Sequence, residues 1–261
     1  MNKCIWSIAT LLLLCSLTYA SEIVMPAAQI QKGKGTVAIY WTRADQNLSL
    51  QVTNKDEIKV NNSSYFSEVT NDFKCNGRAN SILVKAVINP IDEGFYYWLK
   101  AGSGSYDLEI PSSSVTNKLS GRNPGSIVGF GMRSQLFPDT IVTPALAIEM
   151  GGSYSAFDLD VFRSGSGPNE LISDKLEIFE AQFACIVSKK IGKFEPFGGL
   201  KIFRTHTLLR HVSSLGSVSG TKDNAGLFAG TRYYVHSAES VVIEGSFVGE
   251  TTFSLGWNID F

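Results

Sequence analysis

The chain closes on Thr252-Phe253-Ser254-Leu255-Gly256-Trp257-Asn258-Ile259-Asp260-Phe261. Through this stretch apolar side chains alternate with small or polar ones. Successive side chains of a β-strand point to opposite faces, so the stretch predicts a strand with one apolar face and one polar face.

The N-terminus predicts export. Lys3 supplies a positive charge, residues 4–15 are almost entirely apolar, and Thr18-Tyr19-Ala20 places small side chains where a signal peptidase reads them. A stretch of this length is too short to span a bilayer as a helix. We expect a Sec-type signal peptide over 1–20, cleaved near Ala20.

From residue 93 onward the pattern predicts eight strands, most of them near the nine to eleven residues that a tilted membrane strand needs. They are expected at 95–110, 125–136, 141–154, 176–188, 197–205, 226–236, 241–248 and 252–261. Single-chain bacterial barrels use an even strand number. The expected fold is all-β: a transmembrane antiparallel β-barrel of eight strands over 93–261.

The links between these strands alternate in length. Short links at 138–140, 190–195 and 237–240 are separated by long Ser/Gly-rich ones at 111–124, 157–175 and 206–225. Short turns at one end and long loops at the other are typical of membrane barrels, although the last link, near 249–250, is short where a long one is expected. A soluble β-sandwich is the alternative, because its strands also alternate.

Residues 21–92 carry more charge and shorter apolar runs. The pattern predicts a hairpin from 36–43 and 48–53, a polar loop over 54–64 and a strand at 81–89. We expect a partly β N-terminal periplasmic extension. The alternative is that these residues add strands and enlarge the barrel to ten or twelve.

Three stretches carry a family resemblance: 94–102 (GFYYWLKAG), 194–200 (FEPFGGL) and 226–234 (GLFAGTRYY), followed by the terminal strand. Residues 93–261 resemble the small outer-membrane β-barrel superfamily, which includes the OmpA membrane domain, OmpX-like proteins and opacity-type surface proteins. The resemblance implies a bacterial outer-membrane location, contact with its lipid, and recognition by the barrel-assembly machinery through the C-terminal strand. Its assembly signal is expected at Phe253, Leu255, Trp257, Ile259 and Phe261.

Each predicted strand contributes one charged residue near its polar face. These are Lys100, Arg133, Glu149, Glu180, Lys201, Arg232, Glu244 and Asp260. Buried charges must be paired, so we expect a plug of salt bridges in the lumen; a selectivity lining for a channel is the alternative.

Two pairs in this set are expected directly from the strand order. Arg232 and Glu244 lie nearly opposite across a short turn, and Glu180 with Lys201 is a plausible second pair. Arg133 and Glu149 are some four residues out of simple register and are expected to need intermediaries.

The sequence favours a structural or surface-interaction protein over an enzyme. His206 and His211 lie close to Ser213 and Ser214, which is the basis of a lipid-acting enzyme as a lesser alternative, but no G-x-S-x-G elbow occurs. A porin-like channel for small solutes is the main alternative. We expect no cofactor and no metal, and an extracellular ligand would bind the long loops.

Two further features bear on partners and cross-links. A net charge of −1 gives no electrostatic reason to expect nucleic acid. Outside the predicted signal peptide the cysteines are Cys75 and Cys185, whose pairing the sequence leaves open.

Overall fold

The computed structural model describes residues 26, 30, 32–60, 63–90, 94–111, 116–165, 167–211 and 217–261. Here the chain is all-β, as the sequence predicts. In chain order the strands are β1 (Gly35–Val60), β2 (Ser63–Ile88), β3 (Phe95–Pro111), β4 (Thr116–Ser120), β5 (Gly125–Phe137), β6 (Ala145–Ser164), β7 (Asn169–Ser188), β8 (Phe194–His211), β9 (Ser217–Tyr234), β10 (Glu239–Phe247) and β11 (Glu250–Asp260). The predicted signal peptide lies outside the described residues, and within them no helix has the length and apolar character to cross a membrane.

In β11 the alternating sequence pattern produces one buried face and one exposed face. Its even-numbered residues from Thr252 to Asn258 are buried, whereas the apolar residues between them are 44% to 48% exposed. A strand in a water-soluble protein buries its apolar face. The inverted pattern fits a strand whose apolar face meets lipid and whose polar face lines an interior.

The sheet closes into a ring because β1 pairs with β2 on one side and with β11 on the other. The β1–β11 register runs from Thr36 opposite Asp260 to Gln46 opposite Glu250. In the part of the barrel where β1 pairs with β11, β3 pairs with β5 and β5 pairs with β6. Ten strands therefore complete the ring there. The predicted count of eight is therefore wrong, because β1 and β2 are part of the barrel wall.

β1 is one continuous strand rather than the hairpin that the sequence predicts around residues 44–47. Arg43 and Asp45 break the apolar run, but they keep the alternation of faces and point outward, as partly exposed side chains. Charge is tolerated on the outer face wherever that face meets water instead of lipid. The charged stretch therefore marks where the strand leaves the membrane, and the strand continues beyond it.

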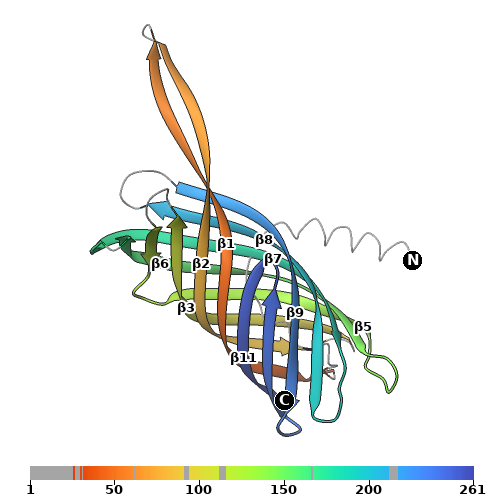
Figure 1. The fold of residues 1–261 in the computed structure, drawn as a ribbon. Helices are drawn as coiled ribbons and strands as arrows, with labels where there is room; N and C mark the ends of the chain where they lie inside the picture. The colour runs from red at the N-terminus through yellow and green to blue at the C-terminus, as the bar shows by residue number, and fades with distance from the viewer. Residues whose placement is uncertain are drawn as a thin grey trace, which may run out of the picture.

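The ring changes composition toward its upper end in Figure 1. β10 and β11 stop at residues 248–249, and above them β9 meets β1 where Ser219 lies opposite Gln51. The short strand β4 pairs with β3 and β6 above the end of β5. The upper ring therefore consists of eight strands: β1, β2, β3, β4, β6, β7, β8 and β9.

The links at the lower end are short: residues 89–94, 138–144, 189–193 and 235–238. Phe261 lies at this end as well, and its backbone exchanges hydrogen bonds of 2.9 and 3.0 Å with Gly35. In bacterial barrels short turns face the periplasm. We therefore assign this end to the periplasm and the upper end to the exterior.

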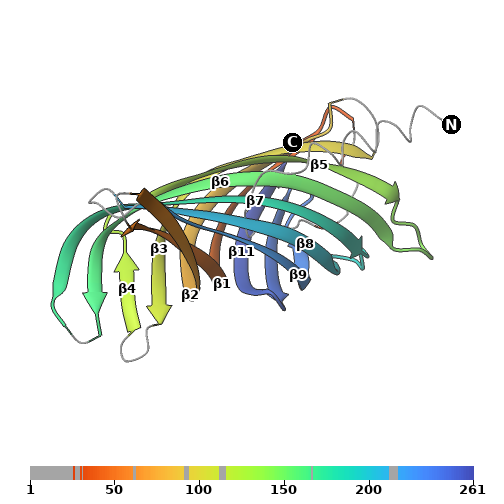
Figure 2. The ribbon, with the colours of Figure 1, turned by 90° about the horizontal axis from the view of Figure 1, so that it is seen from above.

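Much of what the sequence predicts as long outer loops is strand. β6 extends to Ser164 and β7 begins at Asn169, so most of 157–175 is a hairpin; β8 and β9 likewise occupy most of 206–225. Ser- and Gly-rich composition hides the alternation there. The barrel wall there consists of paired strands in place of loops (Figure 2).

The β1–β2 hairpin extends furthest. Its strands pair from Gly35 opposite Ile88 to Val60 opposite Ser63, whereas β3 accompanies β2 only as far as Asn76. Beyond the ring the hairpin therefore projects alone (Figure 1). The disulfide between Cys75 on β2 and Cys185 on β7, which the sequence left open, is absent from the structure.

Candidate functional site

The inner face of the barrel gathers the charged residues that the sequence singles out. Seven are buried, with exposed fractions of 1% to 6%: Lys100, Arg133, Glu149, Glu180, Lys201, Arg232 and Glu244. The side chain of the eighth, Asp260, is 33% exposed at the periplasmic mouth. All eight come from alternating positions whose outer neighbours are apolar or small. The register then decides which charges meet.

The first cluster joins β2, β5 and β6. Arg133 donates to Glu149 through Nε at 2.6 Å and also through Nη2, and Lys85 Nζ lies 3.3 Å from the other carboxylate oxygen. Lys85 also stands 4.5 Å from the centre of the Trp98 ring. One buried carboxylate thus pairs with two cations, and one of these cations, Lys85, also lies over an aromatic ring.

The structure differs from the sequence-based expectation in the register of Arg133 and Glu149, and it adds Lys85 to the cluster. Arg133 and Glu149 are direct cross-strand partners, because the link between β5 and β6 occupies residues 138–144 and the register shifts at Gln135. No intermediary is needed. The sequence does not single out Lys85, because it predicts a periplasmic extension there. Buried Leu83, Lys85 and Val87 alternate with more exposed residues, and this alternation is the signal that places Lys85 inside.

The second cluster lies across β8, β11 and β1. Lys201 forms a buried ion pair with Glu250, whose other oxygen accepts a hydrogen bond from Gln46 Nε2 at 2.9 Å. The observed ion-pair partner of Lys201 is thus Glu250 and not the predicted Glu180, because Lys201 lies opposite Ala184, four residues away from Glu180 on β7. The even-numbered residues of the terminal strand point inward, and Glu250 continues this series, so the alternation identifies it as an inward residue.

The third cluster closes the periplasmic mouth. Arg232 Nη2 donates to both oxygens of Asp260 at 2.9 and 3.0 Å, and Nε donates to Ser240 Oγ at 2.7 Å. Asp260 also accepts a 2.6 Å hydrogen bond from Thr36 Oγ1. Arg232 lies opposite Val242, so the predicted partner Glu244 is displaced by two residues along β10.

Above these clusters the lumen changes character. A cavity of about 50 Å³, large enough for a few water molecules, lies beside Lys100 and Glu180. Beyond it the eight-stranded part of the ring is filled by an apolar core that includes Leu48, Leu108, Leu159, Leu176, Leu209 and Val218. A ring of eight strands is just wide enough for side chains to fill. The barrel interior is thus closed by paired charges below and by packed leucines above.

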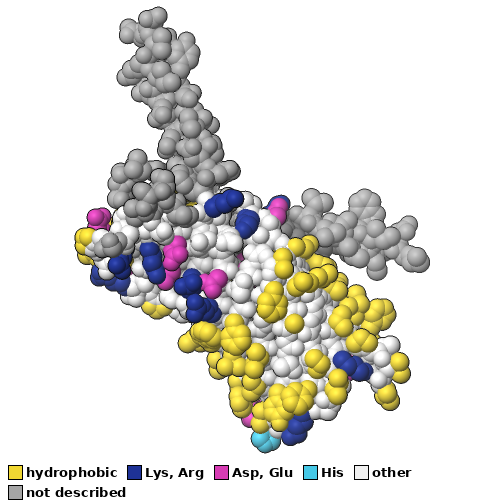
Figure 3. Space-filling model, in the orientation of Figure 1, with side chains coloured by type: hydrophobic (Ala, Val, Ile, Leu, Met, Phe, Trp, Pro, Cys, Tyr) yellow, Lys and Arg dark blue, Asp and Glu magenta, His cyan; other side chains and the backbone are white. Residues whose placement is uncertain are grey.

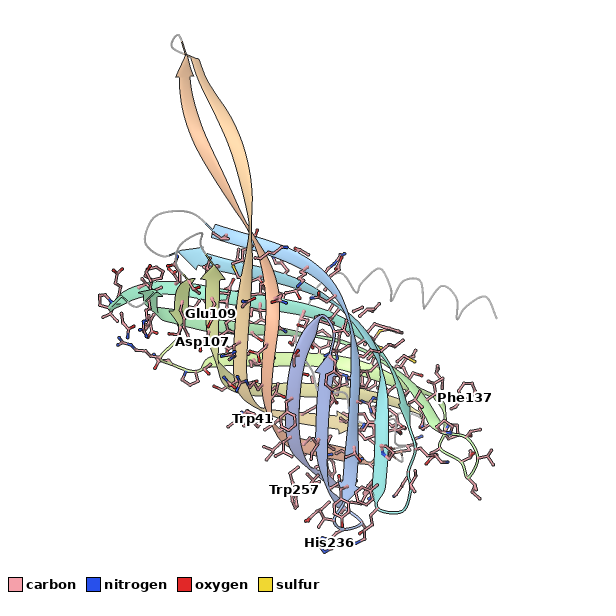
Figure 4. The ribbon with its side chains drawn as sticks, viewed as in Figure 1. Trp41, Asp107, Glu109, Phe137, His236 and Trp257 are labelled. Carbon is pink, nitrogen blue, oxygen red and sulfur yellow. The ribbon has the colours of Figure 1, made fainter. Side chains whose placement is uncertain are left out.

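The outer face carries an apolar belt over the lower part of the barrel (Figure 3). Leu99, Phe130 and Leu200 are 59% to 65% exposed in it. Trp41 packs edge-on against Phe253 with ring centroids 6.1 Å apart, and Trp41 and Trp257 both lie on the outer side in Figure 4. A belt of this kind is what a lipid bilayer requires of a barrel.

Ion pairs mark the upper limit of the belt. Arg78 lies 2.6 Å from Asp45, and Arg204 lies 2.5 Å from Asp223, all with partly exposed outward side chains. At the foot of the projecting hairpin a charged hollow of about 500 Å³ is lined by Asp45, Arg78, Asp107, Glu109 and Lys222, among others (Figure 4). This hollow lies above the apolar belt, at the end of the barrel opposite the short links.

His206 and His236, whose side chains the structure describes, do not assemble a catalytic group. His206 points outward and contacts Thr221 Oγ1 at 3.0 Å, and its ring lies 6.4 Å from that of Phe179. His236 lies in the short turn after β9, 3.7 Å from Glu239. Ser213 and Ser214 fall outside the described residues. Among these residues no set of three His, Cys, Asp or Glu could hold a metal ion.

A closed antiparallel ring, an apolar outer belt and a polar inner face define a class: the chain has the fold of bacterial outer-membrane β-barrels, with transmembrane β-strands. The outer-membrane protease OmpT from Escherichia coli aligns over 93% of this chain and 100% of its own, with 11% identity and a TM-score of 0.50. The translocator domain of the autotransporter NalP from Neisseria meningitidis aligns over 89% of both chains (12% identity, TM-score 0.46). OprG from Pseudomonas aeruginosa aligns over 91% of this chain and 99% of its own (8% identity, TM-score 0.41). No protein-family model matches the sequence, and no curated protein matches it.

Proposed function

We propose that this chain is an integral outer-membrane protein with a structural or surface-interaction role, whose lumen is closed by its own side chains. The observation that carries the proposal is the apolar core of the upper ring, where Leu108, Leu159 and Leu176 are 0% exposed. A path for solutes would have to cross this layer. Packed leucines offer no hydrogen bonds to a hydrated solute, so the layer is a barrier.

The parts available for interaction lie beyond the membrane. The projecting β1–β2 hairpin and the charged hollow at its foot face the exterior, where an extracellular ligand would bind. Surface segments held by a rigid scaffold are the usual location of binding functions in proteins. The proposed role is non-enzymatic; the hydrogen bond between His206 and Thr221 joins two exposed side chains on the outer face of the barrel.

A porin-like channel is the second candidate, favoured by the ten-stranded ring at membrane level, which is wider than the eight strands that the sequence predicts. Single-channel recording on the refolded protein in planar bilayers separates the two. A closed lumen gives no stable conductance steps from folded, inserted protein. Steps of constant amplitude from the wild-type protein would reject the closed lumen and support the channel.

A shortened hairpin supplies the matched control. Removing residues 52–71 and joining Gln51 to Asp72 through Asn-Gly, a sequence that favours a tight two-residue turn, leaves the ring strands intact. We expect this variant to fold with an unchanged unfolding midpoint and to stay silent. Conductance that appears only after the deletion would show that the hairpin helps to close the barrel.

A further inference from the structure

The link between β5 and β6, residues 138–144, presents two aliphatic side chains to its surroundings. Ile141 is 99% exposed and Val142 is 87% exposed, and we call these two residues the apolar tip. The link lies at the periplasmic end of the barrel and extends outward from the ends of its two strands (Figure 1). Leu136 and Phe137, at the end of β5, are exposed apolar residues as well. Four exposed apolar side chains so close together in the chain mark an interaction surface.

Hydrogen bonds within the link fix the backbone beneath the apolar tip. Thr140 Oγ1 accepts hydrogen bonds from the N–H groups of Val142 at 3.3 Å and Thr143 at 3.0 Å. The Thr140 N–H donates to the Thr143 carbonyl at 3.0 Å. Bonds from a hydroxyl to nearby backbone are a common way to fix a turn. The turn therefore holds the two aliphatic side chains outward in a defined arrangement.

Lys189, in the link between β7 and β8, bonds the carbonyl groups of the turn. Its Nζ donates to the Thr140 carbonyl and, at 3.4 Å each, to the carbonyls of Ile141 and Thr143. The same atom donates to Asp139 Oδ1 at 2.9 Å. In water, solvent would satisfy these carbonyls, whereas in lipid each must find a partner within the protein. A turn that satisfies them internally is suited to apolar surroundings.

On β5 the apolar belt continues down to this turn. Its exposed outward apolar residues begin at Val128, below the polar Ser126, and reach Leu136, with Phe137 at the end of the strand (Figure 4). The step from Val128 to Leu136 covers roughly 27 Å along the strand, or roughly 20 Å along the membrane normal at a tilt of about 40°. The apolar band of such a barrel is about 25 Å tall. Roughly 5 Å of the band therefore remains below Leu136, at the level of the turn.

We propose that the apolar tip is a lipid anchor, which inserts Ile141 and Val142 into the inner leaflet of the membrane at the boundary between acyl chains and headgroups. Lys189 and Asp139, whose side chains are partly exposed, stay among the headgroups and hold the turn in its inserting shape. Lipid is the partner because the apolar surface of the turn continues that of the belt. Anchors at the interface set the tilt and depth of membrane-spanning elements, so this one fixes β5 and β6 in the bilayer.

Quenching by brominated phospholipid measures lipid contact at the tip. In the protein with its native cysteines replaced by alanine, Ile141→Cys and Ser237→Cys are each labelled with the same small fluorophore. Each protein is refolded into phosphatidylcholine vesicles with or without bromine on the acyl chains. Ser237 is exposed in the short link after β9 and supplies the matched polar position. We expect brominated lipid to quench the label at Ile141 at least twice as strongly as the label at Ser237.

A second pair of variants tests Lys189 as the positioning residue. Lys189→Met removes the donor to the three carbonyls and keeps a side chain of similar length. Lys193→Met is the control, because Lys193 is an exposed lysine in the same link. We expect Lys189→Met to lower the quenching at Ile141 about twofold and Lys193→Met to leave it unchanged. Heat-modifiable migration shows that each variant is folded before it is measured.

Each outcome decides one of these claims. Equal quenching at Ile141 and Ser237 overturns the anchor and leaves the apolar tip to a periplasmic protein partner. Stronger quenching at Ile141 that Lys189→Met does not lower supports lipid contact and overturns the role of Lys189. None of these measurements depends on whether the lumen is closed, so the anchor and the proposed function fail separately.

Discussion

Replacing Leu99 with arginine places a charge on the lipid-facing side of β3, at a residue that is 64% exposed in the apolar belt. Ser105 lies on the same face of the same strand, six residues further toward the exterior. Six residues at about 3.3 Å each span roughly 20 Å along the strand, or about 15 Å along the membrane normal at a tilt of about 40°. Half of a hydrocarbon core is also about 15 Å thick. The two positions therefore sample the interior and the boundary of the bilayer.

We expect Leu99→Arg to lower the free energy of unfolding by about 2–4 kcal/mol and Ser105→Arg by about 0–1 kcal/mol. The assay is equilibrium unfolding in guanidinium of protein reconstituted in lipid vesicles, with midpoints compared at constant slope. Leu99→Ala corrects for the loss of the leucine side chain. Equal effects at the two positions, or a larger effect at Ser105, would refute the placement of the belt in the membrane.

Three further predictions concern the lumen, a periplasmic turn and the closing strand. Glu149→Gln leaves two buried cations without their carboxylate and should cost about 3–5 kcal/mol in unfolding free energy. Partial burial raises the pKa of Asp139, and this is the largest single effect on that carboxyl. Hydrogen bonds from Lys189 and from the Lys190 backbone together lower the pKa by more, so it lies below its usual range. Asp139→Asn should therefore remove up to about 1 kcal/mol at neutral pH. Deleting Phe261 removes both backbone hydrogen bonds to Gly35 and should reduce the folded, heat-modifiable fraction recovered from the outer membrane.

Each of these predictions has a control and a contrary result. For the lumen, Glu170→Gln at an exposed position should change the unfolding free energy by less than about 0.5 kcal/mol. For the turn, a carboxyl with a depressed folded-state pKa stabilises the protein above its unfolded pKa, so the gap between Asp139→Asn and wild type should close as the pH falls through the folded pKa. A gap that persists at the lowest pH would speak against the ion pair. For the closing strand, full recovery without Phe261 would exclude it as part of the assembly signal.

The alternation of faces predicts the fold class because it is a local property. In β11 each apolar residue from Phe253 to Ile259 is exposed on the outer face, as the sequence pattern requires. The strand count could not be predicted in the same way. Charges at Arg43 and Asp45 indicate water at the outer face, and the sequence alone does not distinguish a strand that leaves the membrane from a turn.

The inward direction of the lumen charges follows from the same alternation, but their partners do not. Lys201 and Arg232 are buried as expected, yet their carboxylates are Glu250 and Asp260, both on β11. Pairing depends on register across the ring, which turn lengths and the irregularity at Gln135 determine. These are properties of the closed barrel, and a single strand's sequence does not contain them.

Closure of the ring by β1 and β11 has a consequence for how the protein folds. Thr36 and Asp260, which hydrogen-bond across this seam, are separated by 224 residues. Contacts of such long sequence separation carry a large loop-closure entropy and slow the search for the native state. One edge of β1 therefore stays unpaired until β11, the last strand, has reached the folding site. A chain that ends early loses the whole barrel, because an open sheet leaves its edge groups unbonded in lipid.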